Sequence, residues 1–110
     1  MATKKQQQAF YEDVLEYIVT MGAKNRHIGE LCSNYKIETK AGELLIFLET
    51  PQTSKVFSIF TCFEDNKRAK EMMPDNDRLN QYSGKWNFHN YTHDECLCRF
   101  KQELAPLLIN

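Results

Sequence analysis

The chain contains 110 residues, of which 42% are hydrophobic and 26% charged, a composition typical of one globular domain. Its 14 basic and 15 acidic side chains leave a net charge of −1. This balance excludes an acidic DNA mimic and disfavours nucleic acid as a partner, because nucleic-acid binders usually carry a basic surplus. Residues 1–54 and 55–110 are each close to neutral, so no charged half of the chain indicates a partner.

No targeting or membrane segment is visible, and we expect a cytoplasmic protein without membrane contact. The opening segment MATKKQQQAF is followed by the acidic, mixed run YEDVLEYIV, whereas a signal peptide needs an apolar stretch of about 7–15 residues. The most apolar run, residues 44–48, is far shorter than the roughly 18 residues of a spanning helix. We therefore expect the four cysteines to be reduced thiols.

Residues 4–21 are predicted to form a helix. Apolar side chains at three- and four-residue spacing form one stripe: Phe10, Val14, Tyr17, Ile18 and Met21. Thr3 is a suitable N-cap, and Gly22 stands where a helix stop is expected. The next segment, residues 23–34, is interpreted as a connector that Ile28 and Leu31 anchor.

Residues 34–49 are predicted to form a hairpin, with Gly42 free to adopt a positive φ in the turn. One face of its first strand consists of Tyr35, Ile37 and Thr39. Its second strand, ELLIFLE, and the next predicted strand, residues 55–63, are apolar on both faces. The faces of the latter are Phe57, Ile59 and Phe63 on one side and Val56 and Phe60 on the other. Strands of this kind are usually central and covered.

The rest of the chain adds a short helix, a strand and a final helix. Asp65 can cap a helix over residues 66–73. Residues 85–90, KWNFHN, alternate as an edge or half-exposed strand does. A T-x-x-E capping box at Thr92 opens the last helix, which Pro106 ends or kinks.

The predicted order is therefore α-β-β-β-α-β-α in a single α+β domain over residues 1–110. The simplest assembly is an antiparallel sheet of about four strands with helices packed on one face.

The predicted hairpin leaves one apolar stripe facing away from the side that its first strand covers. A turn over residues 40–42 leaves Leu44, Ile46 and Leu48 on the far face, and a turn over residues 41–42 leaves Leu45 and Phe47 there. The short helix, the loop around Leu79 and Tyr82, or a second subunit could cover this stripe. We select Leu44, Ile46 and Leu48 as the protein-interaction residues, since an exposed apolar patch marks an interaction site.

The densest group of possible metal ligands lies in HNYTHDECLC and consists of His89, His93, Cys96 and Cys98. Its spacing is not that of a zinc finger, and Cys96 and Cys98 point about 200° apart on a helix of about 3.6 residues per turn. We expect no metal and no cofactor, with one of these cysteines in the core and the other partly exposed. A Cys96 nucleophile with His93 as its base is the enzyme alternative, but no third group or oxyanion site is apparent.

The segment QYSGKWNFHNY carries the nucleic-acid alternative, because aromatic side chains mixed with Lys and Asn can stack bases on a sheet. The residues that would bind are Lys85, Trp86, His89 and Tyr91. Strand periodicity places Trp86 and Phe88 on one face and Lys85 and His89 on the other, which favours a core role for the two rings.

The segments FEDNKRAKEMM and QYSGKWNFHNY resemble small proteins of bacterial phages, plasmids and integrative elements, over residues 57–91. The resemblance implies a mobile-element setting, in which small globular proteins often bind host or defence proteins. It carries no functional residue across. We therefore expect a protein that acts by protein–protein contact, with a second copy of the chain in a homodimer as the leading partner.

Overall fold

The computed structural model describes residues 3–49, 56–77, 79 and 85–108, and the structural statements below concern these residues. The elements in chain order are α1 (Lys4–Thr20), β1 (Lys24–Ile28), β2 (Cys32–Thr39), β3 (Gly42–Glu49), β4 (Phe57–Phe63), α2 (Asn66–Met72), β5 (Lys85–Asn90), α4 (His93–Leu104) and the 3₁₀ turn η1 (Ala105–Leu107). The α+β class is confirmed.

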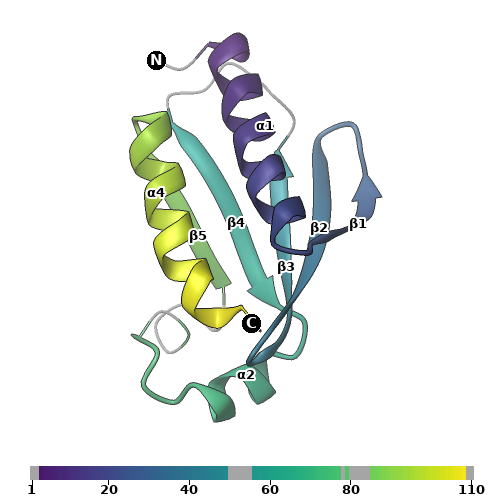
Figure 1. The fold of residues 1–110 in the computed structure, drawn as a ribbon, viewed down its shortest axis with the longest axis vertical. Helices are drawn as coiled ribbons and strands as arrows, with labels where there is room; N and C mark the ends of the chain where they lie inside the picture. The colour runs from purple at the N-terminus through teal and green to yellow at the C-terminus, as the bar shows by residue number, and fades with distance from the viewer. Residues whose placement is uncertain (1–2, 50–55, 78, 80–84, 109–110) are drawn as a thin grey trace.

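The strands form one antiparallel sheet in the order β1-β2-β3-β4-β5, so each strand pairs with its sequence neighbour. Helices α1 and α4 pack against each other and lie together on one face of the sheet, while α2 sits at one end of it (Figure 1). The prediction of helices on one face is confirmed. The described sheet has five strands rather than about four, because residues 24–28 form a strand.

Strand β1 lies in the segment that the sequence indicated to be a connector. All five of its residues are exposed, and the bulge between Asn25 and His27 interrupts its pairing with β2. The expected anchors are wrong, since Ile28 and Leu31 are each 73% exposed. The strand is held by main-chain pairing and by the Asn25 side-chain amide, which donates to the Asn34 carbonyl at 3.4 Å, so no buried side chain marks it in the sequence.

Helix α1 begins at Lys4 as predicted and ends at Thr20, one residue before the predicted end. The Thr3 hydroxyl accepts a hydrogen bond from the Gln6 amide at 3.1 Å, and the Gln6 side chain accepts one from the Thr3 amide at 2.8 Å. The helix is followed by Gly22, whose φ of +102° allows the chain to turn into β1. Of its predicted stripe, Phe10, Val14 and Ile18 are buried against the sheet, whereas Met21 is 39% exposed.

The β2–β3 turn consists of Lys40 and Ala41, since Thr39 pairs directly with Gly42. Gly42 takes a φ of +104°, a conformation that side-chain-bearing residues rarely adopt. The Thr39 hydroxyl accepts from the Ala41 amide at 3.1 Å and donates to the Gly42 carbonyl at 2.7 Å. These bonds fix the turn and, with it, which residues of β3 face the helices.

The C-terminal helix closes the core over β4 and β5. The Thr92 side chain accepts a hydrogen bond from the Glu95 amide at 3.3 Å, as the capping motif predicts. Phe100 is buried and meets Phe88 of β5 edge-on at a centroid distance of 5.3 Å. The α-helix ends just before Pro106, which lies inside η1.

Candidate functional site

The side of the sheet opposite α1 and α4 is the candidate site. We call it the open face and define it by the outward residues of the three central strands: Cys32, Asn34, Lys36, Glu38, Glu43, Leu45, Phe47, Glu49, Ser58, Phe60 and Cys62, with Asn87 and His89 of β5. All of these side chains are partly or largely exposed, whereas almost all of the residues that alternate with them on β2, β3 and β4 lie in the core. No described helix lies over this face.

The expected interaction stripe requires a correction. Leu44, Ile46 and Leu48 are only 1%, 0% and 2% exposed, because they lie under the helices. The turn contains two residues, as in the second of the two predicted registers. Ile46 therefore pairs with Tyr35, and Leu44 with Ile37, on the face that the helices cover. The surplus stripe is therefore Leu45 and Phe47. Of the covers expected for a surplus stripe, Leu79 is fully buried in the core, and Tyr82 lies outside the described residues.

An aromatic pair occupies the centre of the open face. Phe47 of β3 and Phe60 of β4 are direct cross-strand partners, and their rings meet edge-on at a centroid distance of 5.7 Å. Asn34 flanks Phe47 on β2, and Asn87 flanks Phe60 on β5, so a single row crosses four strands. Phe60 remains 38% exposed, which is unusual for a phenylalanine in the middle of a sheet.

A hollow of about 540 Å³ lies over this aromatic pair. Its lining residues are Leu31, Cys32, Phe47, Glu49, Ser58, Phe60 and His89. Leu31, in the β1–β2 loop, forms one wall and is itself largely exposed. An apolar floor with a few polar groups at its margin is typical of binding surfaces.

Charged residues lie around the aromatic row rather than within it. Lys36 Nζ lies 3.9 Å from Glu43 Oε1, and both side chains are partly exposed, so the pair is weak. A hydrogen bond from the neighbouring Glu43 carboxyl and the repulsion between the two acids raise the pKa of Glu64. Among the side chains that the structure describes, the open face thus carries both signs of charge and no continuous basic surface.

The thiols of the open face lack the features of a nucleophile. Burial and the nearby Glu49 carboxylate raise the pKa of Cys32, which favours the neutral thiol. Cys62 is half-buried beside Leu45 on the neighbouring strand. Neither cysteine stands at a helix N-terminus, where a thiolate would be stabilised.

Of the residues predicted for nucleic-acid binding, the structure describes the side chains of His89 and Tyr91, and these two lie at different places. His89 is exposed and lines the hollow, whereas Tyr91 is 77% exposed beyond the end of β5. The side chains of Lys85 and Trp86 lie outside the described part of the structure. Phe88 is buried at 1% exposure, as its strand pattern predicted.

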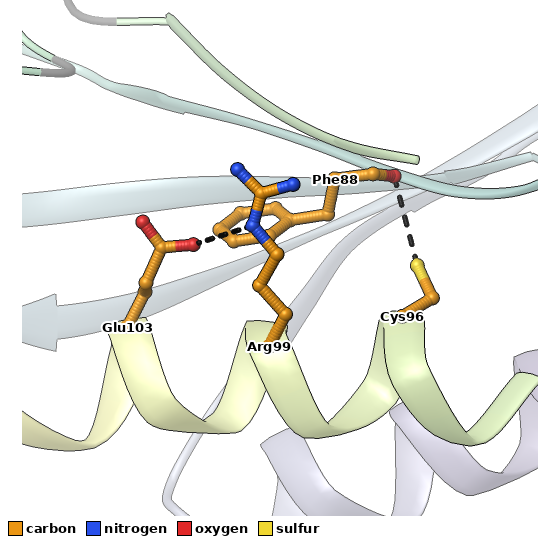
Figure 2. A network of polar contacts seen from close by, with 4 residues as sticks. All are labelled: Phe88, Cys96, Arg99 and Glu103. Carbon is orange, nitrogen blue, oxygen red and sulfur yellow. Dashed lines mark hydrogen bonds and ion pairs between the residues drawn. The ribbon is translucent and has the colours of Figure 1, made fainter. Parts of the chain in front are cut away.

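His93 and Cys96 are close in sequence but face different partners. His93 Nε2 lies 2.8 Å from Asp13 Oδ2 of α1. The Cys96 Sγ donates towards the Phe57 carbonyl at 3.5 Å. It also donates towards the Phe88 carbonyl at 3.7 Å (Figure 2). Burial raises the pKa of Cys96 to about 11, so its thiol is neutral at physiological pH. The geometry does not unite the two as nucleophile and base.

Figure 2 also shows why this stretch of α4 is structural. Arg99 Nε pairs with Glu103 Oε2 at 3.4 Å, and the Arg99 guanidinium lies 5.9 Å from the centre of the Phe88 ring. Burial raises the pKa of Glu103, and the guanidinium opposes this effect. These contacts tie the solvent side of α4 to β5.

Within the described ranges, no three His, Cys, Asp or Glu side chains are grouped to hold a metal ion. The expected split between Cys96 and Cys98 is confirmed, with Cys96 buried and Cys98 exposed. Among the described helices, none has the length and apolar character needed to cross a membrane.

Comparisons with family models, curated proteins and solved structures found no match. Sequence reasoning missed the centre of the candidate site, although two signals pointed to it. Phe47 lies in the stripe that a two-residue turn leaves on the far face, whereas we selected the stripe that a three-residue turn leaves there. The alternation of residues 55–63 predicts that Phe60 faces away from Phe57. Pairing these two signals across β3 and β4 requires the strand order, which the sequence does not provide.

Proposed function

We propose that this protein acts by protein–protein contact through the open face, and that its partner is a second copy of the chain. The observation that carries the proposal is the exposed Phe60, paired with Phe47 at the centre of a sheet face that no described helix covers. Interfaces commonly place aromatic residues at the centre and polar residues at the rim. Asn34, Asn87 and the charged residues beyond them supply such a rim.

The size of the face supports a specific dimer. Five strands spaced about 4.8 Å apart, rising about 3.4 Å per residue, cover roughly 550 Å² in projection. Stable interfaces bury about 600–1,000 Å² per partner, and the accessible area of a pleated surface exceeds its projection. A two-fold dimer is the commonest arrangement of identical chains and uses the same patch on both copies.

The oligomeric state tests the proposal directly. Light scattering after size-exclusion chromatography is expected to show a dimer at high micromolar concentration and a monomer for Phe60→Asp. Val19→Asp is the matched control, since Val19 is 53% exposed on α1, on the helix side of the molecule. A wild-type monomer, or equal behaviour of Phe60→Asp and wild type, would overturn the proposal.

Base stacking on the open face is the second candidate function. Two aromatic side chains on adjacent central strands, flanked by the amides of Asn34 and Asn87, are the favouring observation. The mixed charge of the face weighs against it, because phosphate contacts usually supply most of the affinity. Fluorescence anisotropy of a labelled single-stranded oligonucleotide, titrated with the protein at low salt, tests for binding. No change at tens of micromolar protein removes this candidate.

The setting of the protein is also part of the proposal. The resemblance over residues 57–91 supports a gene on a bacterial phage, plasmid or integrative element. A location in the cytoplasm is a separate part of the proposal. The neighbouring genes test the first point: mobility or phage genes on both sides support it, and housekeeping genes on both sides contradict it. Fractionation of cells that produce the tagged protein tests the second.

A further inference from the structure

We infer that the two copies pack with their strands antiparallel, so that Lys36 of each copy faces Glu49 of the other. This inference rests on the proposed function and specifies its geometry. The two charges lie on opposite sides of the aromatic row: Lys36 is two residues from Asn34 along β2, and Glu49 is two residues from Phe47 along β3. The face is therefore self-complementary about that row.

The register of the sheet defines the two flanking rows. One row contains Lys24, Lys36, Leu45 and Cys62, which are successive cross-strand partners. The other contains the pairs Cys32–Glu49 and Ser58–His89. The first row carries positive charge at its β1 and β2 positions, and the second carries the Glu49 carboxylate beside the hollow.

Charge decides between the two ways of aligning the facing strands. A parallel arrangement, with the two-fold axis along the strands, would reverse the strand order and stack each row on the same row of the other copy, the lysine row on the lysine row and the Glu38–Glu43 row on its own copy. Facing like charges are strongly unfavourable. An antiparallel arrangement, with the two-fold axis across the strands at the aromatic row, places each lysine row over the partner's Glu49 row.

The distances allow the contact. In this arrangement Lys36 lies over β2 of the other copy, one strand or about 4.8 Å sideways from Glu49. Packed sheets are about 10 Å apart, a gap in which two long side chains from opposite sheets can meet. The contact of Lys36 with Glu43 within its own chain, at 3.9 Å and partly exposed, is weak enough to exchange.

A charge-swap cycle tests the inference by sedimentation equilibrium. Lys36→Glu and Glu49→Lys are each expected to weaken the dimer roughly tenfold, because each substitution occurs twice in a two-fold interface. The double variant is expected to return to within about threefold of the wild-type dissociation constant. Lys24→Glu combined with Glu49→Lys is the matched control, since Lys24 lies on the same row but one strand further out. This control is expected to restore nothing.

The outcomes separate the two proposals. In one outcome the wild type is a dimer that Phe60→Asp disrupts, but the effects of the two charge reversals add without compensation. That outcome overturns the antiparallel geometry and leaves the proposed function standing. A wild-type monomer removes both. Thermal melts check that each variant folds, and Lys36→Gln with Glu49→Gln gives a milder pair if a charge reversal impairs folding. In that pair, an unchanged dissociation constant for both variants also contradicts the inference.

Discussion

Asp13 Oδ2 lies 2.8 Å from His93 Nε2, which joins α1 to the first residue of α4. This nitrogen is buried, and the described residues offer it no hydrogen bond of good geometry, so its contact with Asp13 is a close approach of two polar atoms. The His93 ring also meets Phe10 edge-on at a centroid distance of 5.3 Å and lies 5.7 Å from the Phe57 ring. The histidine that the sequence offered as a catalytic base is thus a junction between two helices and β4.

A double-mutant cycle on this junction has a defined expectation. His93→Ala is expected to cost about 1–2 kcal/mol in the free energy of unfolding, because it removes the ring packing together with the polar contact to Asp13. Asp13→Ala is expected to cost less than about 1 kcal/mol, since its carboxylate is half-exposed. The double variant is expected to fall short of additivity by a few tenths of a kcal/mol. Urea denaturation measures all four proteins, and strict additivity would show that the two residues do not interact.

The corrected stripe predicts a contrast between neighbours on β3. Ile46→Ala is expected to lower the unfolding free energy by about 2–5 kcal/mol, because the side chain is fully buried and leaves a cavity. Leu45→Ala on the open face is expected to cost less than about 1 kcal/mol in the monomer. Denaturation at low micromolar concentration separates these effects from dimer formation. Similar losses for the two variants would contradict the assignment of faces.

The elements whose apolar side chains recur at a regular spacing could be predicted from the sequence. The assignment of residues to the two faces of a strand could not, where it depends on one residue more or less in a turn. Phe10, Val14 and Ile18 mark α1 because their spacing fits a helix that one face buries. The faces of β3 depend on whether the turn contains two or three residues, and both of its sides are apolar. The turn position selects the buried set, so the site centre at Phe47 could not be chosen from β3 alone.

Cysteine labelling is expected to follow exposure. Cys98 is exposed on α4 and should react first with an aromatic disulfide reagent, whereas Cys96 should react only as the protein unfolds. The half-buried Cys32 and Cys62 should react at intermediate rates. Mass spectrometry of peptides after timed labelling assigns each site, and a Cys98→Ser variant checks the fast phase. Early modification of Cys96 in the folded protein would contradict its burial.

Alkaline pH is expected to destabilise the fold through Cys96. Burial raises the pKa of this thiol from 9.0 to about 11, so the folded protein holds a proton that the unfolded chain releases between these values. The stabilisation is complete below pH 9 and is lost as the pH rises through 11, by up to roughly 2–3 kcal/mol.

A Cys96→Ala variant isolates this effect, because Cys32 also has a raised pKa and contributes in the same range. Burial and the Tyr11 hydroxyl raise the pKa of Tyr35 from 10.0 to about 12, so its contribution begins near pH 10. Unfolding free energies should therefore be compared between pH 8 and 10, where the wild type is expected to lose stability more steeply than Cys96→Ala. Parallel curves over this interval would show that the Cys96 thiol is not buried in its neutral form.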